Sequence, residues 1–271
     1  MSDAATAIAD RLIRAIDSSM PLQPFTASDP AFDVGAGYEV LAQVHARRRA
    51  QGWQPVGRKI GFTNRTIWAR YGVDRPMWSH VWDRTLTWAS NGSASISLKG
   101  FQEPRIEPEV VFKLARSLPA DTSADALLEA VDWMAPGFEI VHSVFPGWKF
   151  KAPDCTAAFG LHAALVVGTP LMIDDSNRAA IAAMLPRFAI SLRSGERLVD
   201  SGCGDNVLGS PLNALAHLRD LLAGQPLFPA LAAGEFVTTG TLTDAWPVAP
   251  GQRWSSDYTT LGIQGLVVEF S

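Results

Sequence analysis

The chain has 271 residues, of which 47% are hydrophobic and 18% charged, and its formal net charge is −4. This composition predicts a soluble globular protein with a large buried core in one or two domains. The acidic balance gives no basic face for a nucleic acid, so we expect no nucleic-acid partner. We also expect no membrane partner and a cytoplasmic location, because no apolar run reaches about 18 residues and residues 1–19 lack the features of a signal peptide.

The N-terminal part has the spacing of amphipathic helices. Apolar residues recur at helical intervals within residues 3–18 and again within residues 36–50. A loop rich in Pro, Gly, Ser and Asp separates the two stretches. We therefore predict a helical N-terminal segment over residues 1–85, followed by a second domain over residues 86–271.

The second domain is predicted to be rich in strands. Short β-branched and aromatic runs alternate with turn residues: TLTWAS, SASISL, EVVFKLA, HAALVVG, FAISLRS, GEFVTTGTL and GLVVEF. Three helical insertions interrupt them, DTSADALLEAVDWM, SNRAAIAAML and SPLNALAHLRDLL, the last with Ser210 at the N-cap and Pro211 in the first turn. The fold class is therefore α+β, a β-roll or barrel with a small helical N-terminal segment. A doubly wound α/β fold is the weaker alternative, because no GxGxxG follows a strand.

Two carboxylates stand side by side at the start of one predicted strand. Glu107 and Glu109 in RIEPEVVFKL are two residues apart, so their side chains share one face and repel each other unless a positive charge lies between them. Glu139 follows in an apolar setting. Three carboxylates without a Cys or His pair suit Mg²⁺ or Mn²⁺. The alternative is an exposed sheet face, with Glu139 paired to an arginine such as Arg105.

Six segments, taken in order, resemble one known family. They are GRKIGFTN at 57–64, EPEVVF at 107–112, GFEIVHS at 137–143, W-K followed by Asp154, SGCGDNVLGSPLNALAHL at 201–218 and LAAGEFVTTGTLTDAWPVAPGQ at 231–252. The chain resembles the 2-keto-4-pentenoate hydratase and 4-oxalocrotonate decarboxylase branch of the fumarylacetoacetate hydrolase superfamily. The resemblance covers nearly all of the chain from about residue 40 and implies a fumarylacetoacetate hydrolase-like catalytic domain.

The resemblance also implies roles for particular residues. Glu107, Glu109 and Glu139 would bind a divalent metal, Mg²⁺ or Mn²⁺. The catalytic lysine would be Lys59, which donates a hydrogen bond or carries a proton; its alternative is a surface lysine at the start of a strand. Substrate-binding residues implied by the same likeness are Lys59, Asp154, Thr241 and Thr243, although the TTGTLT segment could equally be an ordinary turn between strands.

The sequence departs from the family pattern at two places. Met77 stands where family hydratases commonly have an acidic residue, and Ala158 and Phe159 replace a polar pair after Asp154. These changes suggest a more apolar substrate tail or a catalytic acid supplied by another residue. The candidates for that acid are His80, Asp83 and His142, of which His142 is better explained as a hydrogen-bonded core or interface histidine.

The leading functional hypothesis is a metal-dependent hydratase. The family's substrates are small 2-oxo or 2-hydroxy-enoic acids from aromatic or related catabolism, and its reactions pass through a metal-stabilised enolate. The alternatives are a 4-oxalocrotonate-type decarboxylase, an acylpyruvate C–C hydrolase, and a non-catalytic 2-oxo-acid binding protein. By analogy with the family, we also expect a homo-oligomer.

Overall fold

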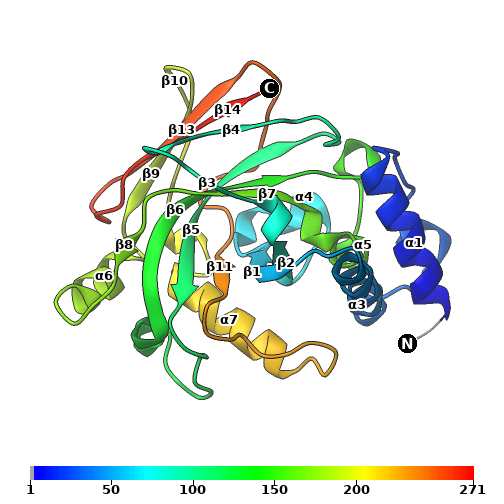
Figure 1. The fold of residues 1–271 in the computed structure, drawn as a ribbon, viewed down its shortest axis with the longest axis horizontal. Helices are drawn as coiled ribbons and strands as arrows, with labels where there is room; N and C mark the ends of the chain where they lie inside the picture. The colour runs from blue at the N-terminus through cyan, green and yellow to red at the C-terminus, as the bar shows by residue number, and fades with distance from the viewer. Residues whose placement is uncertain (1–2) are drawn as a thin grey trace.

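A computed structural model describes residues 3–271, which form two sheets flanked by helices (Figure 1). Within these residues the larger sheet has the strand order β2-β1-β11-β5-β6-β7-β3, with β12 and β8 pairing with β5 and β6. Its strands are β1 (Pro55–Gly61), β2 (Met77–Trp82), β3 (Leu86–Trp88), β5 (Arg105–Leu114), β6 (Val131–Val141), β7 (His162–Val167), β8 (Leu171–Met172), β11 (Phe236–Thr238) and β12 (Trp246–Pro247). The central strands β5 and β6 are long, antiparallel and almost wholly buried.

The smaller sheet packs against one end of the larger one. Its order is β10-β9-β13-β14-β4, formed by β4 (Ser93–Ile96), β9 (Ala189–Ser194), β10 (Arg197–Cys203), β13 (Arg253–Tyr258) and β14 (Leu266–Phe270). One apolar cluster joins the two sheets and includes Phe138, Ile140, Trp254 and Val268. The two curled sheets therefore share a core, as the α+β prediction requires.

The N-terminal helices form a layer beside the larger sheet, on the right in Figure 1. The longer ones are α1 (Asp3–Asp17) and α3 (Val34–Ala50), and α3 also packs on α5 (Ala152–Ala157). The short helices α2 (Phe25–Ser28), α4 (Trp68–Tyr71) and α6 (Arg178–Met184) lie in connecting segments. Among residues 3–271, no helix combines the length and apolarity needed to cross a membrane.

Helix α7 (Pro211–Ala223) forms as its local signals predict. The Ser210 side chain accepts a hydrogen bond from the N–H of Leu212, and Pro211 occupies the first turn. Leu215, Leu218 and other apolar residues of the helix are buried in the largest core cluster. In Figure 1 the helix lies below the larger sheet. The N-cap prediction for this helix is confirmed.

Two predictions of secondary structure were wrong. The segment before residue 85 is helical only in part, because residues 55–61 and 77–82 form strands of the larger sheet. Strand β2 is buried on both faces and so lacks the alternation that reveals a strand in sequence. The helix expected in DTSADALLEAVDWM is only a 3₁₀ turn, η3 (Asp125–Ala130), and the chain then enters β6. A domain division at residue 85 stays a prediction.

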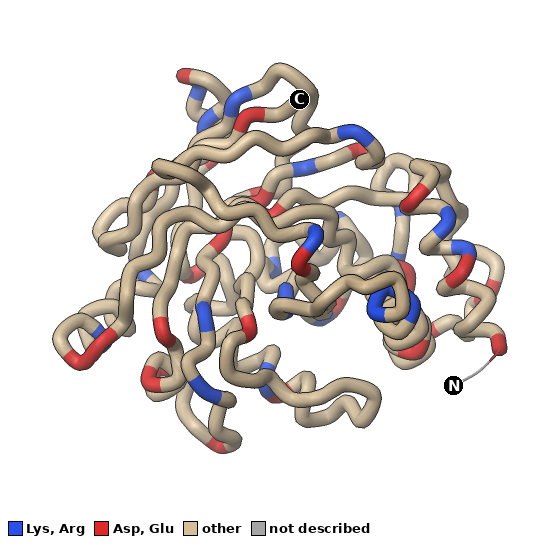
Figure 2. Tube along the Cα trace, viewed as in Figure 1, with Lys and Arg blue, Asp and Glu red and all other residues tan. Residues whose placement is uncertain are grey.

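Charged residues of both signs are interspersed along the chain (Figure 2). Some of them tie the N-terminal helices together: Arg47 pairs with Asp10 at 2.5 Å, and Arg48 with Asp17 at 2.6 Å. Arg48 is nevertheless buried. The basic run at residues 45–49 therefore serves helix packing in this structure.

Candidate active site

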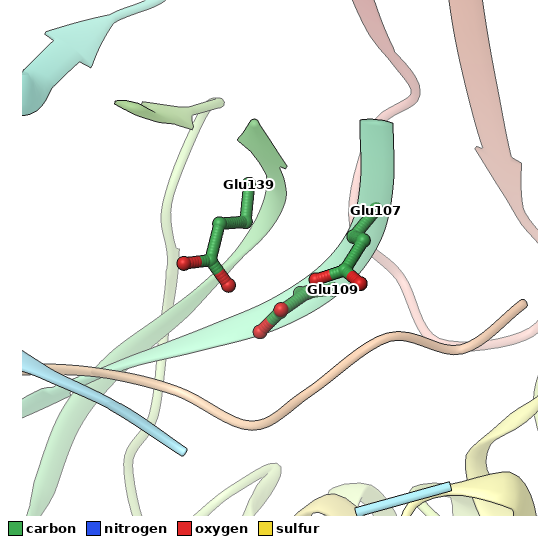
Figure 3. A group of neighbouring side chains, drawn as sticks. All are labelled: Glu107, Glu109 and Glu139. Atoms are coloured by element: carbon green, nitrogen blue, oxygen red, sulfur yellow. The ribbon is translucent and has the colours of Figure 1, made fainter. Parts of the chain in front are cut away.

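The register of two neighbouring strands brings three carboxylates together. Glu107 and Glu109 lie on the same face of β5. Glu139 on β6 is the direct cross-strand partner of Glu107. One oxygen of each carboxylate lies within 4.8 Å of the others, and Figure 3 shows the three side chains grouped on the two adjacent strands. The expected proximity is therefore observed, while metal binding by the cluster stays a prediction.

Glu109 and Glu139 each have one carboxylate oxygen in a hydrogen bond with the protein and one without a hydrogen bond. Oε2 of Glu109 accepts a hydrogen bond from the N–H of Gly240 at 2.7 Å, and Oε1 of Glu139 lies 2.7 Å from Nδ1 of His162. Oε1 of Glu109 and Oε2 of Glu139 are buried without a hydrogen-bond partner in the described residues. A buried carboxylate oxygen without a hydrogen bond is costly. A hard divalent cation among the three side chains would satisfy both oxygens, so the donor set fits such a metal.

Lys59 supplies the positive charge that the sequence led us to expect near the carboxylates. It extends from β1, and its buried Nζ lies 3.2 Å from Oε2 of Glu139. The geometry at Oε2 is that of an ion pair and not of a hydrogen bond. Nζ instead donates a hydrogen bond to the backbone carbonyl of Gly160 at 2.8 Å. The amine is therefore fixed next to the carboxylates with donor capacity to spare.

The charges in this cluster are unevenly balanced. Burial raises the pKa of Glu107 to about 7. Burial and the neighbouring carboxylates raise the pKa of Glu109 well above its usual value. At Glu139 burial is opposed by Lys59 and by the contact with His162, and the pKa falls below its usual value. Burial opposes the charge on Lys59, but the three carboxylates outweigh it and raise the pKa of the amine. One cation thus balances one carboxylate, and a further positive charge is what the cluster lacks.

His162 is a site residue that the sequence did not reveal. It begins β7, and its ring bridges Glu139 and Thr85: Nδ1 lies 2.7 Å from Oε1 of Glu139, and Nε2 lies 2.8 Å from Oγ1 of Thr85. The ring is almost fully enclosed. Only the pairing of β6 with β7 places this histidine beside the cluster, and no local pattern encodes that pairing.

A small cavity adjoins the carboxylate cluster. Its volume is about 30 Å³, and its polar lining consists of Lys59, Glu107 and Thr241. The rest of the lining is largely apolar and includes Phe62, Ile67, Tyr71, Val141, Trp148 and Leu161. The site therefore combines a charged end with an apolar end.

The backbone around this cavity is strained. Phe62, Trp148 and Leu161 all line it, and all have positive φ, at 56°, 57° and 66°. The left-handed region is unfavourable for residues with a side chain, at a cost on the order of 1–3 kcal/mol each. Such strain is typical of functional sites, where the surrounding structure holds the backbone in place.

The TTGTLT segment contributes a backbone donor and one of the two predicted threonines. Gly240 has φ +97°, and a Cβ at this position would lie 1.8 Å from Oγ1 of Thr63, so only glycine fits. Thr241 lines the cavity, and its hydroxyl donates to the carbonyl of Thr243. Thr243 is buried, and its own hydroxyl donates to the carbonyl of Asp244. Thr243 is not among the described residues that line the cavity.

Asp154 lies elsewhere, in the first turn of α5. Its carboxylate accepts hydrogen bonds from the backbone N–H and the hydroxyl of Thr26, at 3.0 and 2.6 Å, and from the N–H of Lys151 at 2.9 Å. It is fully buried and ties α2 to α5. The structure therefore does not bring Asp154 to the cavity, and its position explains the residue through helix capping.

The three candidates for a catalytic acid also lie outside the cavity lining of the described chain. His80 on β2 is cross-strand from Arg58, and its ring centroid lies 4.1 Å from that of His45 with the two rings tilted. Burial, followed by the charge of Arg58, lowers the pKa of His80. Asp83 accepts a hydrogen bond from a loop N–H. Nδ1 of His142 accepts a hydrogen bond from the N–H of Gln102 at 3.3 Å. The interpretation of His142 as a hydrogen-bonded core histidine agrees with this contact.

Comparison with known proteins finds hydratases and a decarboxylase that are similar to this chain over most of its length. No family model matches the chain. A 2-hydroxyhexa-2,4-dienoate hydratase of Comamonas testosteroni is 30% identical over 246 residues, which cover 90% of this chain and 89% of that protein. A 2-keto-4-pentenoate hydratase of Paraburkholderia xenovorans is 30% identical over 94% of this chain and 91% of its own length. A 4-oxalocrotonate decarboxylase of a Pseudomonas species is 30% identical over 94% of each chain.

Solved structures show the same fold. The 4-oxalocrotonate decarboxylase from Pseudomonas putida G7, complexed with magnesium and adipate, matches with a TM-score of 0.88 at 24% identity over 99% of this chain and 98% of that one. A fumarylpyruvate hydrolase from Pseudomonas aeruginosa, in complex with Mn²⁺ and pyruvate, matches with a TM-score of 0.57 at 16% identity over 79% and 88% of the chains. The predicted fold class is thus confirmed, and the chain belongs to the family of 2-keto-4-pentenoate hydratases and 4-oxalocrotonate decarboxylases, with a fumarylacetoacetate hydrolase-like fold.

Proposed function

We propose that the protein is a Mg²⁺- or Mn²⁺-dependent hydro-lyase that hydrates a 2-hydroxy-2,4-dienoate, or the derived 2-oxo-enoate, in the catabolism of aromatic or related compounds. The observation that carries the proposal is the cluster of Glu107 with the fully buried Glu109 and Glu139, and with Lys59 against it. The relatives named as hydratases support the reaction class.

The metal would be held by Glu107 and by the oxygens of Glu109 and Glu139 that have no hydrogen bond. When bound, the cation withdraws charge from the carboxylate and C2 oxygen of a 2-oxo or 2-hydroxy acid. Glu107 lines the cavity, whereas Glu109 and Glu139 are fully buried beneath it. A ligand in the cavity would therefore meet the cluster from the Glu107 side.

Lys59 is the group best placed to act on the substrate oxygen. Lys59 lines the cavity, its amine donates a hydrogen bond to Gly160, and the three carboxylates favour the protonated amine by raising its pKa. An ammonium here donates a hydrogen bond to the C2 oxygen as the dienol loses its proton and a distal carbon gains one. Water then adds to the carbon activated by conjugation with the 2-oxo group.

The apolar end of the cavity favours a substrate with an uncharged tail. Lys59 is the only cationic side chain among the described residues of the lining. A second carboxylate on the substrate would lie among side chains such as Phe62 and Trp148, where an unpaired charge is unfavourable. A monocarboxylic dienoate therefore fits better than a dicarboxylate such as 4-oxalocrotonate.

The decarboxylase remains the second candidate because one cation lies close to the apolar end. Arg105 stacks on Trp148 at 4.0 Å and donates a hydrogen bond to the hydroxyl of Tyr71 at 2.6 Å. A rotation of the two aromatic rings would expose this guanidinium to a distal carboxylate. The relative named as a 4-oxalocrotonate decarboxylase supports the same alternative.

An acylpyruvate hydrolase has less support. Its water-activating base would be a Glu-His pair, and the pair present is Glu139 with His162. Both ring nitrogens of His162 already have partners, Glu139 and Thr85, which leaves neither to take a proton from water.

Substrate binding must enlarge the cavity. A volume of about 30 Å³ has room for only about two water molecules. The lining side chains Phe62, Tyr71 and Trp148 have to move to admit a five-carbon acid. We expect this rearrangement to exclude water from the charged end once the acid is bound.

A product assay separates the candidates. The protein, freed of metal with EDTA and reloaded with Mg²⁺ or Mn²⁺, is mixed with 2-hydroxypenta-2,4-dienoate or with 4-oxalocrotonate. Hydration consumes the dienoate absorbance and adds the mass of water, whereas decarboxylation releases CO₂. Turnover of the dienoate that requires metal and is lost in Glu109→Gln supports the proposal. Binding of 2-oxo acids without turnover would indicate the non-catalytic binding protein, and CO₂ release alone would indicate the decarboxylase.

The expected homo-oligomer also stays a prediction. Light scattering on the purified chain tests it, because an oligomer gives a mass that is a multiple of 29.2 kDa.

A further inference from the structure

We propose that His162 is a positioning residue that holds Glu139 in the orientation needed for metal binding. It would fix Oε1 of Glu139 so that Oε2 is the oxygen presented to the cation. This inference rests on the proposed metal site and deepens it, since it assigns a function to a residue beside the three carboxylates.

The histidine ring is held at both ends. Nδ1 lies 2.7 Å from Oε1 of Glu139, and Nε2 lies 2.8 Å from Oγ1 of Thr85. The exposed fraction of the ring is 2%, and that of the Glu139 side chain is 0%. A ring fixed in this way can set the orientation of the carboxylate that it contacts.

The hydrogen on Nδ1 of His162 can be assigned from the contact with Glu139. An ionised Glu139 only accepts, so Nδ1 of His162 carries the hydrogen of that bond. On the other side of the ring, Nε2 of His162 at 2.8 Å and the backbone carbonyl of Trp82 at 3.1 Å both lie within reach of the single hydroxyl hydrogen of Thr85. The N–H of Trp82 donates to the same Thr85 oxygen at 3.2 Å. Thr85 thus holds the ring at Nε2, and the bond to Glu139 holds it at Nδ1.

The role that we propose for these hydrogen bonds concerns the other oxygen of Glu139. Oε2 has no hydrogen-bond partner in the described residues, yet Lys59 lies only 3.2 Å away. Without the bond at Oε1 the carboxylate is free to rotate and pair both oxygens with the ammonium. The bond from His162 opposes that rotation and leaves Oε2, which is ion-paired with Lys59, without a hydrogen bond. Loss of a hydrogen bond to a metal ligand typically weakens metal affinity about 10–100-fold.

A second histidine offers a matched control. His142 and His162 are each 6% exposed, and both line the same cavity of about 270 Å³. Nδ1 of His142 accepts a hydrogen bond from the N–H of Gln102, and among its described contacts none is to a carboxylate of the cluster. Replacing His142 therefore tests for general damage in this part of the core.

The experiment compares four full-length proteins: the wild type, His162→Phe, His162→Asn and the control His142→Phe. Phe keeps the ring and removes the donor, whereas the Asn amide nitrogen can donate from nearly the position of Nδ1. Each metal-free protein is titrated with Mn²⁺ by calorimetry and by electron paramagnetic resonance. We expect affinity to fall about 10–100-fold in His162→Phe. We expect the affinity for Mn²⁺ to remain within about threefold of the wild type in His162→Asn and in His142→Phe. The first variant keeps a hydrogen-bond donor to Glu139, and the second leaves His162 in place.

Each outcome distinguishes the hypotheses. If His162→Phe binds Mn²⁺ like the wild type, the positioning function is wrong and the metal site survives. Equal losses in His162→Phe and His142→Phe would mean general core damage and would also refute it. If the wild type itself binds no Mn²⁺, the proposed metal-dependent function fails. If His162→Phe does not fold, Thr85→Val is tested in its place. This variant removes the partner of Nε2, so it should weaken Mn²⁺ binding. Unchanged binding in Thr85→Val would contradict the proposal.

Discussion

Glu107→Gln should stabilise the metal-free protein at alkaline pH, although it removes a candidate metal ligand. Burial raises the pKa of Glu107 from 4.5 to about 7. Each pKa unit corresponds to about 1.4 kcal/mol, so ionising this carboxyl costs the folded state roughly 3 kcal/mol above pH 7. Because Glu107 is partly exposed, solvent screening reduces the expected cost to about 2 kcal/mol. A glutamine at this position keeps the shape without that cost.

The sign of the pH dependence follows from proton linkage. The pKa of this acid is higher in the folded state, which therefore binds more protons than the unfolded state between pH 4.5 and about 7. Stability is lost as pH rises through this window, and the cost is absent below pH 4.5. Burial lowers the pKa of His45 and of His142 to about 4, which produces the opposite trend in the whole protein. Those histidines are common to both proteins and cancel in the difference between wild type and variant.

The assay is urea denaturation in EDTA at pH 5 and at pH 8. We expect Glu107→Gln to exceed the wild type by about 2 kcal/mol at pH 8 and by much less at pH 5. With Mg²⁺ at about 100 times its dissociation constant, the wild type should gain about 2.7 kcal/mol and the variant little. A variant less stable than the wild type at pH 8 without metal, or a difference that is independent of pH, would refute the reasoning.

Three further substitutions test other parts of the structure. Lys59→Met should lower kcat by about 10²–10⁴-fold. It should also lower the free energy of unfolding by about 3–5 kcal/mol, because it leaves buried charge uncompensated. Full activity in steady-state assays would exclude Lys59 from the reaction. Gly240→Ala should weaken Mn²⁺ binding in calorimetry, because its Cβ would lie 1.8 Å from Oγ1 of Thr63 and displace the N–H that holds Glu109; unchanged affinity would show that this bond is dispensable. Ser210→Ala should lower the free energy of unfolding by about 1 kcal/mol through loss of the α7 N-cap, and it should leave kcat unchanged. Denaturant unfolding tests the first expectation and steady-state kinetics the second.

Features that depend on neighbouring residues were predictable from the sequence. The start of α7 follows from Ser210 and Pro211 because capping acts within one turn. Glu107 and Glu109 had to share a face once β5 was recognised, because side chains alternate along a strand. The ordered segments that resemble the family added the fold, which the comparisons confirm.

Features that depend on strand order and register were decided only by the tertiary structure. Lys59 lies near the carboxylates because β1 joins the larger sheet beside β11, which pairs with β5. His162 touches Glu139 because β7 pairs with β6, and Gly240 reaches Glu109 because the segment after β11 folds back on β5. The opposite case is Asp154, whose family-like position led us to expect a substrate contact but whose oxygens are taken by Thr26 and Lys151. Local sequence fixes which face of a strand a side chain uses, while long-range pairing, which depends on the packing of the whole core, determines what it meets there.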